Sequence, residues 1–167
     1  RRAESLMCGI AGIIYKDGQH PIGAEMTRML QSMKHRGPDS TGYALYGQPS
    51  NLVIMRYKLA DANTPRDFEY EDRLRRHRAE VERRLHALGA KVHALVEENE
   101  YAFRVTLEYD GDLKRLADFI EDVPDAEVLS LGNSLEIVKD LGDAESVAGG
   151  YQLNEFTGTH AIGHVRM

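Results

Sequence analysis

Cys8 is the side chain whose type and position in this sequence offer the clearest route to chemistry. A cysteine at the first position of a mature chain has a free α-amine beside it, which titrates at about pH 8 and can accept the thiol proton. The sulfur could then attack an amide carbonyl, the amine could pass the proton to the leaving ammonia, and water could hydrolyse the thioester. This chemistry requires cleavage after Met7, so residues 1–7 are expected to be a leader or propeptide. The competing interpretation is a small buried core residue.

Composition narrows the classes of protein that Cys8 could belong to. The chain has 167 residues, 42% of them hydrophobic, which suits one globular core with a modest insertion. It contains no apolar run of bilayer-spanning length, so we expect no membrane contact. A formal net charge of -6 argues against a nucleic-acid surface. One cysteine cannot form an internal disulfide, so a reducing, cytoplasmic location is expected.

Apolar periodicity predicts the elements that position the ends of the chain. The run that opens at Cys8 is apolar, contains glycines and stops at a Lys-Asp-Gly turn, as expected of a buried strand. Methionines and a leucine then recur at helical spacing, until Gly37 and Pro38 break the pattern. Strands are therefore expected at 8–15, 41–46, 52–57 and 160–166, with a helix that ends near residue 34.

The centre of the chain differs in composition, beginning at Thr64-Pro65. Arginine and glutamate dominate the stretch that follows, with apolar residues at helical spacing, which predicts a long exposed helix with mixed-sign charge pairs. Acids interleave with the arginines and no aromatic platform accompanies them, so a solvated face or a subunit contact is favoured over nucleic-acid binding. Further elements are expected as a helix at 66–88, hairpin strands at 91–96 and 101–109, a helix capped by Asp112, and strands at 127–131 and 134–139.

These patterns predict an α+β chain in four parts. The leader is 1–7, the first part of the main domain is 8–64, an inserted α+β subdomain is 65–148, and the main domain continues at 149–167. Gly149-Gly150 is the expected hinge at the exit from the insertion.

Three separated stretches carry a resemblance to a known family. They are M-C-G-I-A-G-I at 7–13, H-R-G-P-D-S-T-G at 35–42 and I-G-H-V-R-M at 162–167. In this order they resemble the motifs of class II glutamine amidotransferases. These are N-terminal-nucleophile hydrolases that include glutamate synthase, asparagine synthetase, amidophosphoribosyltransferase and glucosamine-phosphate synthase. The resemblance covers both ends of the chain and leaves its centre unmatched.

The resemblance implies a four-layer α-β-β-α sandwich and a role for each matching residue. Cys8 corresponds to the nucleophile, and Arg166 to the arginine that grips the α-carboxylate of glutamine; the alternative for Arg166 is a surface ion pair. Arg36 and Gly37 correspond to a turn that supports the site, and they also suit a simple helix stop. His35, Asp39, Ser40 and His164 are expected to be structural, and no metal site is expected.

The family's oxyanion-hole Asn-Gly pair and its amine-binding acid lie downstream of the third motif. They are absent from this sequence, so the chain is expected to be part of a longer, apparently truncated domain that hydrolyses glutamine poorly by itself.

The sequence around Arg166 resembles the corresponding motif in glutaminases of the glutamate-synthase and N-methylglutamate-synthase type. This implies that ammonia passes to a synthase subunit in a hetero-oligomer, and that FMN and an iron-sulfur cluster belong to that partner. No cofactor is expected in this chain, because its one cysteine is already assigned.

Three alternatives stay open. An asparagine-synthetase-type enzyme has the same H-R-G-P-D motif, but its third motif follows the second at a short distance in the sequence. A non-catalytic regulatory or scaffold subunit would keep the fold while the leader blocks Cys8. The inserted subdomain could also be the module that docks the synthase.

Overall fold

The computed structural model describes residues 8–36 and 39–167, which form two antiparallel sheets and four α-helices. They divide into two compact units, unit 1 (residues up to Gln48, and Ile137–Met167) and unit 2 (Pro49–Glu136). The strands are β1 (Gly9–Ile14), β2 (Ser40–Tyr46), β3 (Val53–Lys58), β4 (Lys91–Glu97), β5 (Ala102–Glu108), β6 (Glu127–Gly132), β7 (Leu135–Leu141) and β8 (His160–Arg166). The helices are α1 (Ile22–Ser32), α2 (Tyr70–Ala87), α3 (Leu113–Glu121) and α4 (Ala144–Gly150), with short 3₁₀ turns η1 (Lys34–Arg36) and η2 (Leu153–Glu155).

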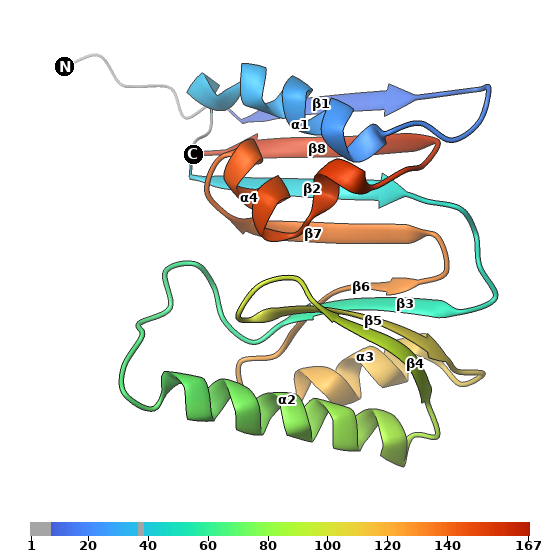
Figure 1. Ribbon diagram of the computed structural model, residues 1–167, viewed down its shortest axis with the longest axis vertical. Helices are drawn as coiled ribbons and strands as arrows, with labels where there is room; N and C mark the ends of the chain where they lie inside the picture. The colour runs from blue at the N-terminus through green and yellow to red at the C-terminus, as the bar shows by residue number, and fades with distance from the viewer. Residues whose placement is uncertain (1–7, 37–38) are drawn as a thin grey trace. The chain divides into compact units, whose positions relative to one another are not determined.

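Unit 1 is a sheet with strand order β1-β8-β2-β7, covered on one face by α1 and α4 (Figure 1). Alternate residues of each strand face these helices, so Tyr43 and Val165 are buried. Gly163 lets α1 approach β8 closely, because a Cβ at this position would lie 2.5 Å from Leu30 Cδ1. The helix-facing side of this sheet is therefore a packed core.

Unit 2 has the chain order β3-α2-β4-β5-α3-β6 and the strand order β4-β5-β3-β6. This is the split βαβ arrangement, in which each helix connects two strands that are separated by a third. The helices and the strand residues that face them form one core, which includes Met55, Val81, Val105 and Leu116.

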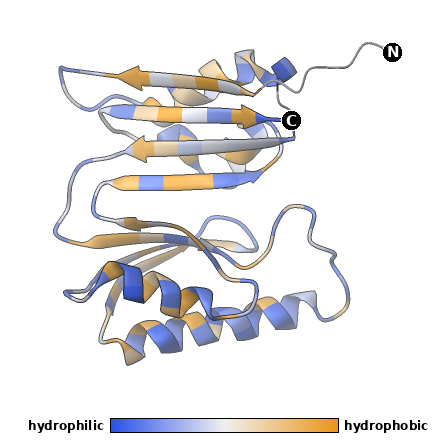
Figure 2. Ribbon diagram, turned by 180° about the vertical axis from the view of Figure 1, so that it is seen from behind, coloured by the Kyte–Doolittle hydropathy of each residue, from blue (hydrophilic) through white to orange (hydrophobic). Residues whose placement is uncertain are grey.

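Helix α2 is the predicted exposed, charge-paired helix. Figure 2 shows it as mostly hydrophilic, and its buried residues are Tyr70, Val81 and Leu85. Pairs along the helix include Arg78 with Glu82, at 3.1 Å. The prediction of mixed-sign pairs on a solvated face is confirmed.

The elements predicted from periodicity are confirmed at both ends and in the centre of the chain, and so is the α+β class. The prediction that the first strand is buried is wrong, because β1 lies at the edge of its sheet and Ile10 and Ile14 are 72% and 70% exposed. The Asp112 side chain accepts a hydrogen bond from Arg115 N at 2.8 Å, as a helix cap should. In the described residues no helix is both long and apolar enough to cross a membrane.

Two features differ from the sequence-based expectations. The second unit runs from Pro49 to Glu136, whereas composition places the insertion at 65–148, because β3 pairs with β5 and β6 while β7 joins the sheet of β2. The predicted hinge at Gly149-Gly150 is wrong. These glycines end α4, which begins after Asp143.

Candidate active site

Cys8 directly precedes β1, and Arg166 is the last residue of β8. The antiparallel register pairs Gly9 with Val165, so the next position on each strand is Cys8 on one and Arg166 on the other. In Figure 1 the start of β1 and the end of β8 lie at the same end of the sheet. Cys8 is exposed, which contradicts the interpretation of a buried core cysteine.

The second predicted motif reaches the same end of the sheet through β2. Ser40 pairs with Arg166, and the Asp39 backbone N–H donates to the carbonyl oxygen of Arg166 at 3.1 Å. Pairing with β1 on one side and β2 on the other therefore fixes the backbone that carries the Arg166 side chain.

Arg36 lies one turn beyond the end of α1. Its N–H donates to the carbonyl of Met33 at 2.8 Å, and the Met33 sulfur lies 3.4 Å from where a Cβ of Gly9 would be. Arg36 therefore follows shortly after Met33 in the chain, and the Met33 side chain borders the start of β1. Gly37 falls outside the described residues, so its predicted role rests on the sequence.

The two arginines carry exposed positive charge at this end of unit 1. Arg36 and Arg166 are both exposed, and among the described residues no carboxylate lies within 4.0 Å of either guanidinium. The structure therefore gives no support, in the residues that it describes, to the alternative of a surface ion pair for Arg166. A guanidinium without an acidic partner can bind a substrate carboxylate through two parallel hydrogen bonds.

A cavity of about 300 Å³ opens on β2, β7 and β8, and Arg166 belongs to its lining. Strand alternation places its main contributors on the sheet face away from the helices: Ser40, Gly42, Lys139, Ile162, His164 and Arg166. His164, expected to be structural, thus contributes to the cavity wall. In the described part of the chain, no three His, Cys, Asp or Glu side chains are grouped to hold a metal ion.

One contact that supports this end of the sheet was not predicted from the sequence. Gly142, in the loop between β7 and α4, donates its N–H to the carbonyl of Asp39 at 2.9 Å, and its own carbonyl accepts from Thr41 Oγ1 at 2.8 Å. Its φ of 114° favours glycine. The Leu-Gly-Asp wording before α4 was the available signal, because a glycine followed by a capping aspartate marks a turn into a helix.

Comparison with known proteins found no matching family model. The chain is 39% identical over 166 residues to "Putative glutamine amidotransferase" of Methanothermobacter thermautotrophicus, covering 96% of this chain and 52% of that protein. It is 29% identical over 163 residues to "Glutamine amidotransferase-like protein GlxB" of Rhizobium meliloti, covering 96% of this chain and 50% of that protein. The chain thus spans about half the length of the curated relatives that it matches.

These similarities support the coarser prediction, a glutamine amidotransferase family. Both alignments run through nearly the whole chain, so they include residues of unit 2 as well as residues of unit 1.

Proposed function

We propose that this chain carries the nucleophile and the carboxylate-binding arginine of a class II glutamine amidotransferase. The observation that carries the proposal is the convergence of Cys8 and Arg166 at one end of the sheet, with the start of β2 on the other side of β8. The names of the two relatives support glutamine as the substrate.

The proposed reaction has two halves. With Cys8 as the first residue, its α-amine takes the thiol proton while the sulfur attacks the side-chain carbonyl carbon of glutamine. The carbon–nitrogen bond then breaks, the proton goes to the leaving nitrogen, and ammonia departs from a glutamyl thioester. Water attacks the thioester, which yields glutamate and returns the thiol proton.

Arg166 is proposed to bind the α-carboxylate of glutamine. Its guanidinium is exposed, belongs to a cavity wall and occupies the register position next to Cys8, which suits a substrate that bridges the two residues. Arg36 and Gly37 are proposed to support the turn beside the nucleophile.

The proposed fold is the α-β-β-α sandwich, of which unit 1 would supply one sheet and its helices. The sheet face away from α1 exposes Ile10, Ile14 and Ile162 by 72%, 70% and 52%. An apolar sheet face of this kind is normally covered by a second sheet.

The ammonia is proposed to pass to a glutamate-synthase-like subunit that holds FMN and an iron-sulfur cluster. The I-G-H-V-R-M wording at residues 162–167 supports this type over the asparagine-synthetase type. Unit 2 separates this motif from the second one, which also suits the proposal.

The test uses the protein isolated from its natural source. Mass spectrometry reads its N-terminus, and ammonia release from glutamine measures activity. We expect a chain that begins at Cys8, and loss of activity in the Cys8→Ala variant. Arg166→Gln should raise KM for glutamine on the order of 100-fold, because a charged bidentate contact is lost. Arg28→Gln is the matched control, since Arg28 is an exposed arginine of α1 in the same unit.

Two results would contradict the proposal. One is a mature chain that retains Met7, which supports the non-catalytic scaffold. The other is ammonia release that survives Cys8→Ala.

A further inference from the structure

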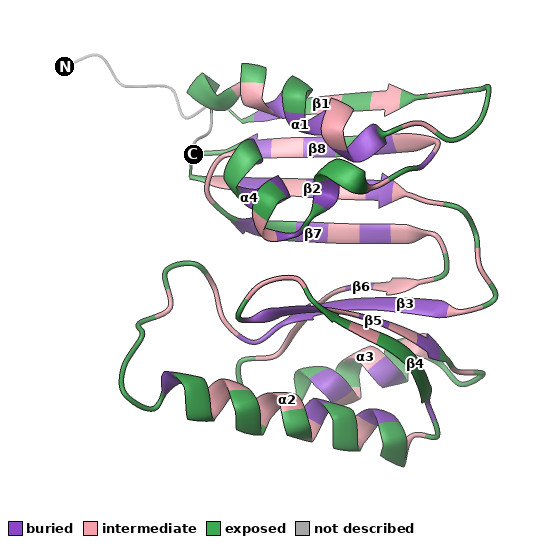
Figure 3. Ribbon diagram, viewed as in Figure 1, coloured by how far each residue is buried: buried purple, intermediate pink, exposed green. Residues whose placement is uncertain are grey.

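Thr41 is a buried side chain, at the end of unit 1 that carries Arg166, which the proposed reaction does not use. Buried and half-buried residues alternate along β2 (Figure 3), and Thr41 is 1% exposed on the face that the helices cover. Its hydroxyl donates to the carbonyl oxygen of Gly142 at 2.8 Å, in the loop that leads from β7 into α4. A buried hydroxyl is costly without a partner, so this hydrogen bond holds the loop against the start of β2.

The backbone of Gly142 carries this connection on to Arg166. The Gly142 N–H donates to the carbonyl of Asp39 at 2.9 Å, and the Asp39 N–H donates to the carbonyl of Arg166 at 3.1 Å. The ladder between β1 and β8 ends one pair earlier, at Gly9 and Val165. Asp39 is thus a direct contact to the backbone of the arginine, and Gly142 is a direct contact to Asp39.

The loop before α4 is also bound to α1 and to the middle of β2. The Gln31 side chain donates to Asp143 Oδ2 at 3.3 Å and accepts from the N–H of Glu145 at 3.3 Å. The Tyr43 hydroxyl donates to the carbonyl of Ala144 at 3.0 Å. The loop is therefore a fixed point of unit 1, and the first residues of β2 are tied to it.

We propose that Thr41 is a positioning residue, which sets the place of the Arg166 guanidinium for the α-carboxylate of an amide substrate. This assignment rests on the proposed function, in which Arg166 binds that carboxylate. Ser40 pairs with Arg166, so the next residue, Thr41, points to the opposite face of the sheet and acts through Gly142 and Asp39. A bidentate contact between a guanidinium and a carboxylate is directional, so a displaced Arg166 backbone weakens it.

Thr41→Val tests the assignment, because valine keeps the shape of the side chain and removes the hydroxyl. KM for glutamine should rise about tenfold while kcat stays within about twofold, because the weakened contact is made in the ground state and the transition state alike. Thr41→Ser retains the hydroxyl, and its KM should lie within about threefold of the wild-type value.

Thr27→Val is the matched control. Thr27 is a buried threonine of the same unit, 6% exposed, and its hydroxyl donates to the carbonyl of Gly23 at 2.7 Å within α1. Loss of this hydrogen bond should lower the melting temperature, as Thr41→Val does, and leave KM for glutamine unchanged. Far-UV circular dichroism confirms that each variant is folded.

A double-variant comparison separates positioning from a general structural role. In an Arg166→Gln background, Thr41→Val should have no further effect on KM, because the arginine through which Thr41 acts is gone. A purely structural role would raise KM in both backgrounds. The variants are introduced into the gene in the natural source, so that the whole protein is assayed.

Equal KM values for Thr41→Val and Thr27→Val would overturn the assignment, and so would an effect of Thr41→Val that persists at full size without Arg166. Either result leaves an active wild type, so the proposed function survives it. A wild type that releases no ammonia from glutamine, or that keeps its activity in Cys8→Ala, overturns the proposed function and this assignment together.

Discussion

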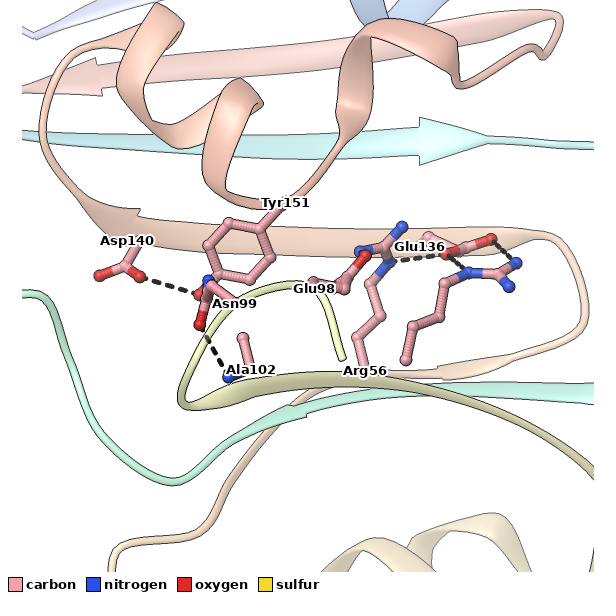
Figure 4. A network of polar contacts seen from close by, with 8 residues as sticks. Arg56, Glu98, Asn99, Ala102, Glu136, Asp140 and Tyr151 are labelled. Carbon is pink, nitrogen blue, oxygen red and sulfur yellow. Dashed lines mark hydrogen bonds and ion pairs between the residues drawn. The ribbon is translucent and has the colours of Figure 1, made fainter. Parts of the chain in front are cut away.

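Replacing Glu136 by glutamine breaks a buried ion network in unit 2 (Figure 4). The Glu136 side chain is 3% exposed and accepts from Arg56 Nε at 2.6 Å and from Arg104 Nε and Nη2 at 2.8 Å each. Arg56 is also 3% exposed and donates to Glu98 through its Nη1 atom. Glu136 therefore holds two arginines, one of which has no access to bulk water.

Glu98 belongs to the same network but is held less well. It is 4% exposed, and its Oε2 atom is buried without a hydrogen-bond partner among the described residues. Burial raises the pKa of Glu98 in spite of the attraction of Arg56. Burial also acts to raise the pKa of Glu136, but hydrogen bonds and charge from Arg104 and Arg56 outweigh it and lower that pKa. The two carboxylates therefore make unequal contributions to stability.

The loss of stability in each variant depends on which charged groups stay buried after the substitution. Breaking a buried ion pair costs about 3–5 kcal/mol when one charge stays buried without its partner. Glu136→Gln should cost about 3 kcal/mol, because the amide oxygen retains one hydrogen bond and Arg56 keeps Glu98. Glu98→Gln should cost no more than about 1 kcal/mol, because Arg56 keeps Glu136 and a desolvated charge is removed. At roughly 2–4 °C per kcal/mol, the Glu136 variant should melt about 6–12 °C lower.

The two carboxylates also give opposite dependences on pH. The contribution of Glu136 is present above its unfolded pKa, which is near the usual value of 4.5, and is lost as pH falls through its lower folded pKa. Glu98 has a raised folded pKa, so its contribution declines as pH rises from 4.5 through that value. Relative to wild type, Glu98→Gln should therefore be more stable at neutral pH than at pH 4.5.

Urea denaturation followed by circular dichroism, at neutral pH and at pH 4.5, measures both effects. Wild type and the two glutamine variants form the matched set. The reasoning is refuted if Glu98→Gln costs as much as Glu136→Gln at neutral pH, or if the relative stability of the Glu98 variant falls as pH rises.

Two further predictions concern the packing of unit 1. Gly23→Ala should lower stability by on the order of 3 kcal/mol, because the new Cβ would lie 1.8 Å from the Leu153 backbone oxygen. Gly149→Ala is the control, because a Cβ at this position would have no atom within 4 Å, and this variant should be neutral or stabilising in thermal melts. Equal melting temperatures for the two would contradict this. Asp143→Ala should cost about 1 kcal/mol at neutral pH, because it removes the cap that accepts from Ser146 N at 3.0 Å. Hydrogen bonds from the side chain and then the backbone of Ser146 lower the pKa of Asp143, so the penalty should shrink as pH falls through the folded pKa. Asp143→Asn should keep most of the cap, and a pH-independent penalty would count against the role of Asp143.

The sequence by itself determined the local elements of this protein. In β5 the alternation of Phe103, Val105 and Leu107 with polar residues predicted a strand with one buried face, and all three are at most 3% exposed. The apolar stripe on α2 and the helix cap at Asp112 were also predicted from the sequence. These features depend on neighbours within a few residues, which is why periodicity and capping chemistry reveal them. Helix α4 was missed because its A-E-S-V-A-G-G sequence ends in two residues of low helix propensity.

Only the tertiary structure decided which of these elements pair with one another. The register of β8 between β1 and β2 places Cys8, Ser40 and Arg166 at one end of a sheet, although they are far apart in the chain. The pairing of Arg56 with Glu136 across 80 residues, and the position of β4 at an edge, also have no local signature. The physical reason is that strand register and order are set by long-range packing, since a strand pattern specifies its buried face but not its neighbour.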